Sequence, residues 1–414
     1  MKIEFKILVS LLLMLISSVT YYGQELELVG NKSDKIVIAD TMSFERIKDF
    51  FYLQDKKKDW KGELKGFIQT DVALDFQEIA FKEGFSAITL ADPKSQVTST
   101  NFSVKQSQLG LDLKKNSAFL GALFSAYVEV DFFGSNGSMS PRFRQGYIKW
   151  GNFLVGQTWS NFSDINIFPN IFDFVGPNGL MLVRKIQFRY SQKLSQKNSL
   201  SLSLEDPNTQ GLFISHNDYS WKNISAFPTF TVLYHYGNNQ NYLKIGGIIA
   251  PIKHEIMHIN SNKRYNPKIL GYGGMLSGKM QCGRLCNVGI QGSYGKGIAN
   301  NNVVLAGENY DAIFNPENKM QLERLGLLNI VGMYEGWWSE KWSSVLYYSY
   351  SKISGSKYVP DLMIQSFQNA GVNLIFHPLK NIRIGIEGNY GKVEKFGQKG
   401  SNGVRLQFSN SFSF

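Results

Sequence analysis

The chain has 414 residues, of which 44 are lysine or arginine and 33 are aspartate or glutamate, a formal net charge of +11. Its mean hydropathy is −0.19, and beyond the amino terminus it holds no run of about 18 apolar residues, which excludes membrane-spanning helices. No nucleic-acid-binding motif accompanies the basic charge, so nucleic acid is not an expected partner. The high aromatic and glycine content fits a transmembrane β-barrel or a secreted all-β protein.

The amino terminus predicts a secretory signal peptide over residues 1–23. Two lysines, Lys2 and Lys6, precede an apolar core, and Gly23 offers a small residue for cleavage. Tyr21 stands where a small residue is usual, so an uncleaved anchor helix is the alternative, although the apolar run is short for a span. The prediction is export through a cleaved signal peptide.

The segment 24–61 is predicted to be a periplasmic lead-in with one short helix. Ser43 is a candidate helix cap, and the apolar residues that follow it fall on one side of a helix. Such a helix would lie at the mouth of the following domain or between subunits. A flexible tail is the alternative interpretation.

Residues 62–414 follow a two-residue period, with apolar side chains on one face and polar side chains on the other. The final strand shows this clearly: Leu406 and Phe408 alternate with Arg405 and Gln407. Several of these segments are about 10 residues or longer, the length a tilted strand needs to cross a bilayer. Strands of soluble sandwiches, the alternative, are nearer 5–6 residues. The segments that show the period are 63–76, 118–132, 199–205, 380–391 and 404–414.

The connections alternate between tight turns and long loops, the pattern of outer-membrane barrels. Eight long loops and seven turns predict about 16 strands and an all-β, antiparallel barrel with an aqueous channel. Segments 142–150 and 227–236 alternate poorly, which leaves the count uncertain by two. The predicted long loops are 77–102, 134–141, 160–184, 206–225, 252–268, 296–325, 354–363 and 395–402.

The two cysteines, Cys282 and Cys286, lie in one predicted tight turn. In an exported protein they can close a disulfide, and two free thiols are the alternative. The spacing is not a zinc pattern, because no histidine or further cysteine pair accompanies it.

The stretch from residue 142 to residue 191 resembles the DcaP-like family of trimeric outer-membrane porins. The matching pieces are Arg142 and Arg144, Gly156-Gln157-Thr158-Trp159, Asp173-Phe174, Gly176-Pro177-Asn178-Gly179, and Arg184 with Arg189. The resemblance implies a pore for small, often anionic solutes such as dicarboxylates, a third loop folded into the barrel, and trimers formed through the barrel wall. It places the chain in the outer membrane of a Gram-negative-type cell, in contact with lipid and lipopolysaccharide.

The loop 160–184 is rich in apolar and aromatic residues, which are poorly suited to bulk water. It is therefore predicted to fold inside the barrel as a constriction, and packing at a subunit interface is the alternative. The residues expected in the constriction are Asp164, Phe168 and Asp173.

Strand parity and the family resemblance together predict which charged side chains face the pore, where arginine and lysine favour anions. Arginine suits carboxylates because its planar fork donates two hydrogen bonds. The alternative is that these groups form ion pairs across the barrel and touch no solute. The predicted residues are Arg142, Arg144, Arg184, Lys185, Arg189, Arg383, Arg405, Lys65, Glu129 and Asp131.

Three other functional classes are alternatives to a porin. Catalysis would need a poised histidine beside a nucleophile, and none of the five histidines stands in such a motif. His254 and His258 are the only pair spaced to share a metal, and no metal or cofactor is expected. A non-conducting structural or adhesin barrel remains the main alternative. An energy-coupled transporter is disfavoured, because it would need a longer chain for its plug domain.

Overall fold

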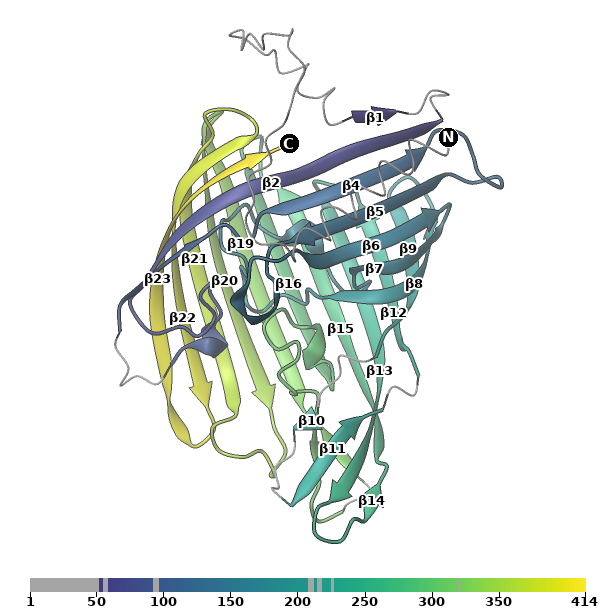
Figure 1. Ribbon diagram of the computed structural model, residues 1–414, viewed down its shortest axis with the longest axis vertical. Coiled ribbons are helices and arrows are strands. Elements are labelled where there is room, and N and C mark those ends of the chain that lie inside the picture. The colour runs from purple at the N-terminus through teal and green to yellow at the C-terminus, as the bar shows by residue number, and fades with distance from the viewer. Residues whose placement is uncertain are drawn as a thin grey trace, which may run out of the picture.

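The protein is a closed antiparallel β-barrel in a computed structural model (Figure 1). The structure describes residues 52–54, 59–91, 97–207, 212–213, 218–224, 227–318 and 321–414. The predicted signal peptide and the predicted helix after Ser43 lie outside these residues. None of the helices within the described ranges is long and apolar enough to cross a membrane.

Sixteen strands form the barrel wall, as the sequence predicts. Each pairs with its neighbours along the chain, and β2 at one end pairs with β23 at the other to close the ring. The strands are β2 (Trp60–Asp75), β4 (Gln108–Lys115), β5 (Phe124–Asp131), β6 (Arg142–Trp150), β7 (Phe153–Trp159), β8 (Arg184–Lys193), β9 (Asn198–Glu205), β12 (Thr229–Gly237), β13 (Tyr242–His258), β15 (Lys268–Gln281), β16 (Cys286–Lys296), β19 (Gly326–Ser339), β20 (Trp342–Ser354), β21 (Ile364–Phe376), β22 (Ile382–Lys395) and β23 (Gln398–Ser413).

Seven shorter strands complete the sheets. β1 (Tyr52–Gln54) and β3 (Ser99–Ser103) pair with β2, and β11 (Tyr219–Asn223) and β14 (Arg264–Tyr265) pair with β13. β10 (Leu212–Phe213), β17 (Ala312–Phe314) and β18 (Leu322–Arg324) form a separate small sheet.

The two faces of the wall differ as the alternation predicts. In β23, Leu406 and Phe408 are exposed, whereas Arg405 and Gln407 are buried. The exposed apolar face is the outer one and suits lipid, while the polar face lines the interior. At the seam, the backbone N–H groups of Gly66 and Phe414 each donate to the other's carbonyl oxygen, at 3.1 and 3.0 Å.

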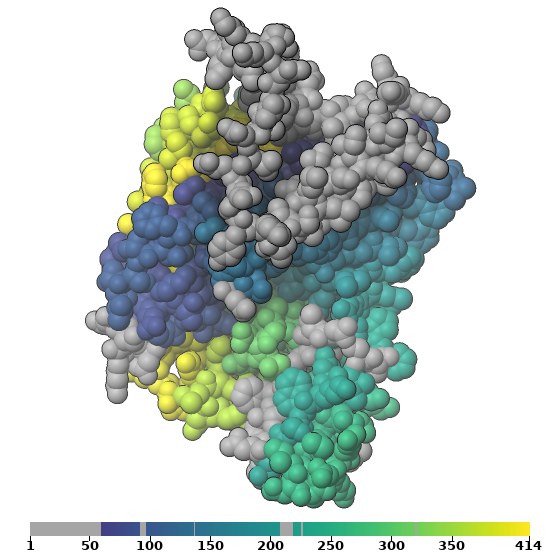
Figure 2. Space-filling model, in the orientation of Figure 1, coloured from purple at the N-terminus to yellow at the C-terminus, as the bar shows by residue number. Residues whose placement is uncertain are grey.

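Two predicted long loops are shorter than expected. β13 continues to His258 and β15 begins at Lys268, so most of segment 252–268 is strand, and only residues 396–397 separate β22 from β23. The extra length of β13 is covered by β11 through five cross-strand pairs. Figure 2 shows this part of the chain, in teal and green, projecting beyond the rest of the barrel. These strand ends carry polar side chains on both faces, so the two-residue apolar period does not mark them as strand.

The tight turn between β15 and β16 carries a disulfide. Cys282 and Cys286 are bonded, with their Cα atoms 5.1 Å apart. The sequence leaves open a disulfide or two free thiols, and the structure shows the disulfide.

Candidate pore site

A cavity of about 1250 Å³ lies in the interior of the barrel. The wall from β2 to β8 borders it on one side, and residues of connections 76–98, 160–183 and 297–325 border it on the other. Basic side chains outnumber acidic ones in its lining. The charged lining residues are Arg142, Arg144, Arg184, Lys185 and Arg383 against Glu129, Asp173 and Glu308.

A β-bulge in β6 brings two arginines into this cavity. Glu129 pairs with Gln145, but the next residue of β5, Val130, pairs with Phe143, so Arg144 has no partner of its own. Such an insertion locally reverses the in–out alternation. Arg144 and Gln145 are therefore both buried, while Phe143 is exposed on the outer face. The bulge explains why this strand alternates poorly in the sequence.

Two carboxylates of β5 hold these arginines in place. Arg142 donates from Nε and Nη2 to the two carboxylate oxygens of Asp131, at 3.0 and 2.7 Å. Arg144 donates from Nε to Glu129 and from Nη1 to Asp131, both at 2.8 Å. Bidentate pairs of this kind fix the guanidinium planes. Arg142 and Arg144 therefore form ion pairs and also line the cavity.

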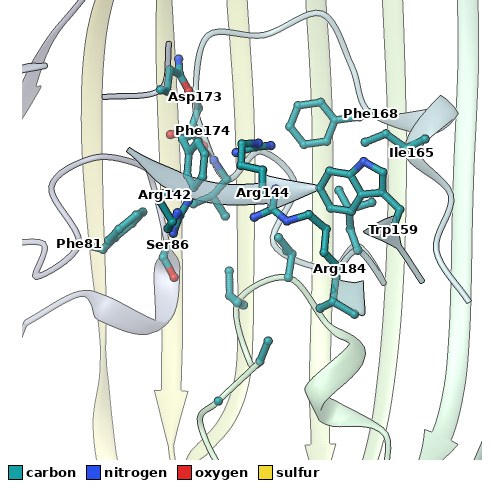
Figure 3. A pocket seen from close by; sticks show the side chains of 18 of the residues that line it. Phe81, Ser86, Arg142, Arg144, Trp159, Ile165, Phe168, Asp173, Phe174 and Arg184 are labelled. Atoms are coloured by element: carbon teal, nitrogen blue, oxygen red, sulfur yellow. Dashed lines mark hydrogen bonds between the residues drawn. The ribbon is translucent and has the colours of Figure 1, made fainter. Parts of the chain in front are cut away.

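Arg184 differs from the other two arginines because no carboxylate pairs with it among the described residues. Its guanidinium lies over the Trp159 ring, 5.0 Å from the centroid. Its Nη1 atom is buried and has no hydrogen-bond partner within the described part of the chain. Figure 3 shows Arg184, Trp159 and Arg144 side by side at the cavity. The site thus holds a guanidinium without a carboxylate partner in the described part of the chain, beside a second guanidinium.

The connection 160–183 is attached at two points to the polar face of distant strands. The Asp164 carboxylate accepts hydrogen bonds from Lys244, Tyr242 and Ser277, at 2.5, 3.0 and 2.6 Å. Farther along, the Glu387 carboxylate accepts the backbone N–H groups of Phe172 and Asp173, at 2.8 and 3.2 Å. The predicted residues Phe168 and Asp173 line the cavity, whereas Asp164 serves as an anchor.

Asn178, near the end of this connection, joins three connections and the wall. Its side-chain oxygen accepts from the Ala87 amide at 2.8 Å, and its Nδ2 donates to the Phe85 carbonyl at 3.0 Å. Its backbone N–H donates to Asn369 of β21, and its carbonyl accepts from Asn302, at 2.9 and 3.0 Å. The side chain is fully buried. Connections 76–98, 160–183 and 297–325 are therefore tied together at one residue.

Aromatic rings lie next to the basic groups. The Arg144 guanidinium is 5.9 Å from the Phe174 ring and that of Arg383 is 5.2 Å from the Phe172 ring. Burial raises the pKa of the Asp173 carboxyl, while the backbone N–H groups that donate to it act in the opposite direction. The cavity thus combines cationic groups with flat apolar surfaces.

Five of the predicted charged residues do not line this cavity: Lys65, Asp131, Asp164, Arg189 and Arg405. Arg405 is almost fully buried and pairs with Asp75 at 2.6 and 3.0 Å. Arg189 donates from Nε to Gln187 at 2.8 Å. Lys65 pairs with Asp112 at 2.9 Å and borders a second cavity of about 440 Å³.

Sequence reasoning missed the roles of Trp159 and Asn178. Both lie in the stretch that carries the family resemblance, which is the one signal that pointed to them. His254 is fully buried, 5.3 Å from the ring of Trp221. No group of three or more histidine, cysteine, aspartate or glutamate side chains within the described ranges is arranged to hold a metal ion.

A closed 16-stranded antiparallel barrel with an apolar outer face and a charged cavity inside is the architecture of an outer-membrane porin. The sequence profile of the DcaP outer membrane protein family matches residues 54–414. The chain belongs to this family.

Solved structures show the same fold. The outer membrane channel DcaP of Acinetobacter baumannii is 21% identical with a TM-score of 0.73, and the match covers 87% of this chain and 99% of that one. An anion-selective porin from Comamonas acidovorans is 11% identical with a TM-score of 0.57, over 86% of this chain and 100% of the other. The trimer form of OmpT from Vibrio cholerae is 9% identical with a TM-score of 0.52, over 86% and 99%. No curated protein sequence matches the chain significantly.

Proposed function

We propose that the protein lets small hydrophilic anions, dicarboxylate-like solutes above all, diffuse passively through a water-filled pore. The observation that carries the proposal is the Arg184 guanidinium, which has no carboxylate partner among the described residues and lies in a cavity whose charged lining is mostly basic. Arginine in a pore lining attracts anions, and its planar fork matches a carboxylate. Arg144 lies beside Arg184 and adds a second positive charge (Figure 3).

The connection 160–183 is proposed to fold into the barrel and narrow the pore. Its anchors at Asp164 and at Glu387 support this, because they attach it to the polar face of β13, β15 and β22. Its residues Phe168 and Asp173 border the cavity directly. A solute would then pass between this connection and the arginines of β6 and β8.

The assembly and the location are also proposed, with support from the comparisons. The family is one of outer membrane proteins, and we expect the chain to reach that membrane through a cleaved signal peptide. There it would contact lipid and lipopolysaccharide. A homotrimer is proposed, consistent with the trimer form of the structural relative from Vibrio cholerae. The relatives are channels, so neither catalysis nor a cofactor is expected.

The test is the reversal potential of single channels in a planar bilayer under a salt gradient. The wild-type protein should open stepwise and prefer anions. In Arg184→Gln the anion-to-cation permeability ratio should fall several-fold. One unit charge at about 8 Å in a water-like medium contributes about 0.5 kcal/mol, about a twofold change for each ion sign.

Arg264→Gln is the matched control, because Arg264 is an exposed arginine of β14 whose nearest carboxylate oxygen, on Glu255, is 3.7 Å away. Its selectivity should equal that of the wild type. Cation preference in the wild type would keep the pore and remove the anion assignment. A folded protein that does not conduct would favour a closed structural or adhesin barrel.

A further inference from the structure

Basic side chains gather on the outer face of the barrel, at the loop ends of β13, β15 and β16, which are neighbours in the wall (Figure 1). Lys268 lies two residues before the exposed Leu270, and Lys296 lies two residues after the exposed Tyr294. Residues two apart in a strand share a face, so both lysines point outward. We call the following residues the outer basic cluster: Lys253, Lys268, Lys296 and Arg324.

The outer basic cluster is arranged around Tyr272 of β15. Lys296 of β16 is directly opposite Tyr272 in the cross-strand pairing. The Arg324 guanidinium lies 5.6 Å from the centroid of the Tyr272 ring, and its Nε donates to the Leu270 carbonyl oxygen at 2.6 Å. Lys268 is four residues before Tyr272, about 13 Å along the strand. Long basic side chains can therefore reach one lipid headgroup from both ends of this stretch.

The charge of this cluster is not offset within the described part of the chain, where none of its four members forms an ion pair with a carboxylate. Lys253 of β13 and Lys268 of β15 are direct cross-strand partners. Like charges directly opposite each other destabilise a sheet. An anion bound at the outer face between these strands would relieve that repulsion.

An apolar groove of about 370 Å³ adjoins the cluster on the same outer face. Its floor is formed by Gly247 of β13 and Gly274 of β15, which are cross-strand partners and bring no side chain to the surface. A Cβ atom at Gly274 would meet only the Gly246 carbonyl oxygen, at 3.8 Å. Exposed apolar and aromatic side chains form the sides of the groove: Phe230, Ile249, Tyr272 and Tyr294.

The position of Tyr272 joins the two features. Its ring carries Arg324 at the cluster and also borders the groove. A free anion would use the cluster alone, whereas a lipid with a charged headgroup and an acyl chain would use both. The arrangement therefore matches an amphiphile whose anionic end lies nearer the loops and whose apolar end lies nearer the middle of the membrane.

We propose that the outer basic cluster and the groove at Gly247 and Gly274 together bind one lipopolysaccharide molecule, with a phosphate group at the cluster and an acyl chain in the groove. Outer-membrane barrels carry their long loops on the extracellular side, so the lipid comes from the outer leaflet. Basic groups beside a membrane attract anionic headgroups. The proposal deepens the proposed contact with lipopolysaccharide and rests on the outer-membrane location, not on the selectivity of the pore.

The test measures the dissociation constant of diphosphoryl lipid A from the full-length protein in detergent micelles, by native mass spectrometry. In Lys268→Gln/Lys296→Gln/Arg324→Gln this constant should rise about tenfold, because three headgroup contacts are lost. In Gly274→Leu it should rise about fivefold, because the leucine side chain occupies the space of the acyl chain. A lipid A analogue without phosphate should bind the wild type about as weakly as diphosphoryl lipid A binds the triple variant.

The matched control is Lys197→Gln/Arg284→Gln/Lys341→Gln, which removes three exposed basic residues from tight turns at the opposite end of the barrel. It should bind lipid A as the wild type does. Unaltered affinity in the triple variant, an equal loss in the control, or displacement of lipid A by inorganic phosphate would overturn the lipid site. So would a variant that changes only the oligomeric state, which would assign this face to a second copy of the chain. If the triple variant does not fold, Gly274→Leu and Lys296→Gln decide.

The two proposals fail differently, because the cluster lies on the outer face and the pore lining on the inner one. The triple variant should keep the anion selectivity of the wild type in planar bilayers. A wild-type channel without anion preference removes the proposed function, whatever the lipid A result. An anion-selective wild type whose affinity for lipid A is unaltered in the triple variant removes only the lipid site.

Discussion

The wall formed by β5 to β8 and the wall formed by β20 to β22 use polar residues in opposite ways. On the first wall, Arg142 and Arg144 pair with carboxylates and line the cavity. On the second, neutral groups such as Asn369 and Ser349 bond to the backbone of connection 160–183. The first wall thus presents paired charges to the cavity, and the second presents amide and hydroxyl groups that bond to the connection.

The difference follows from the cost of burial. An amide or hydroxyl can be buried when it is hydrogen-bonded, whereas a buried charge also needs a counter-charge or several donors. Two charged residues of β22 in the second wall are also held by hydrogen bonds. Glu387 is buried and accepts two backbone N–H groups and the side chain of Asn373, and Arg383 donates to the side chain of Asn170. The first wall therefore carries paired charges at the cavity, and the second holds the connections in place.

The largest effect is expected from Asp131→Ala in the charged wall. It leaves Arg144 buried without one of its two partners and Arg142 without its only one. Removing one member of a buried pair costs about 3 kcal/mol. Urea unfolding followed by tryptophan fluorescence should show this loss, and the channel should become more anion-selective. Unchanged stability would mean that the arginines find water instead.

A smaller effect is expected from Asn178→Ala, which acts on the filled wall. It removes a buried side chain that bonds to Ala87, Phe85 and Gly176. Leaving buried partners unsatisfied costs about 2 kcal/mol. The three connections should move more freely, so single-channel current noise should increase with selectivity unaltered. A loss of anion selectivity with quiet currents would contradict the division of roles.

The smallest effect is expected from Thr158→Val, beside the bulge. The Thr158 hydroxyl donates to Gln145 at 2.7 Å, where the backbone pairing of β6 with β7 has already ended. Losing this bond should cost about 1 kcal/mol. The free energy of unfolding should fall by that amount, with conductance close to that of the wild type. A large change in conductance would show that this contact sets the pore width.

The sequence predicted the barrel well because its signals are local. Strand parity and turn length are read over a few residues, and they identified the closing strand around Phe408 and the number of strands. The grouping of Arg142, Arg144 and Arg184 also came from one short stretch. The features that the sequence did not predict are either contacts between distant residues or breaks in the two-residue period. Asn178 bonds to Asn369, 191 residues away, and no local pattern records such a contact.

The bulge at Arg144 and the long strand β13 show the second kind of failure. One inserted residue reverses parity, so alternation alone cannot say which of Arg144 and Gln145 faces inward. The polar end of β13 extends beyond the apolar band of the barrel, and a strand needs no apolar outer face there. Charge partners were likewise unpredictable, because Arg405 meets Asp75 only across the seam.

That seam makes assembly an all-or-none event for the whole chain. Along the chain β2 is the first strand of the barrel wall and β23 the last, and Arg405 and Asp75 are 330 residues apart. Until β23 arrives, β2 keeps an open edge that can pair with other chains. A chain that lacks its last strand would therefore be prone to aggregate through the open edge of β2, rather than form a slightly weaker pore. The pairing of β2 with β23 is therefore the step that completes the wall and leaves neither strand with an open edge.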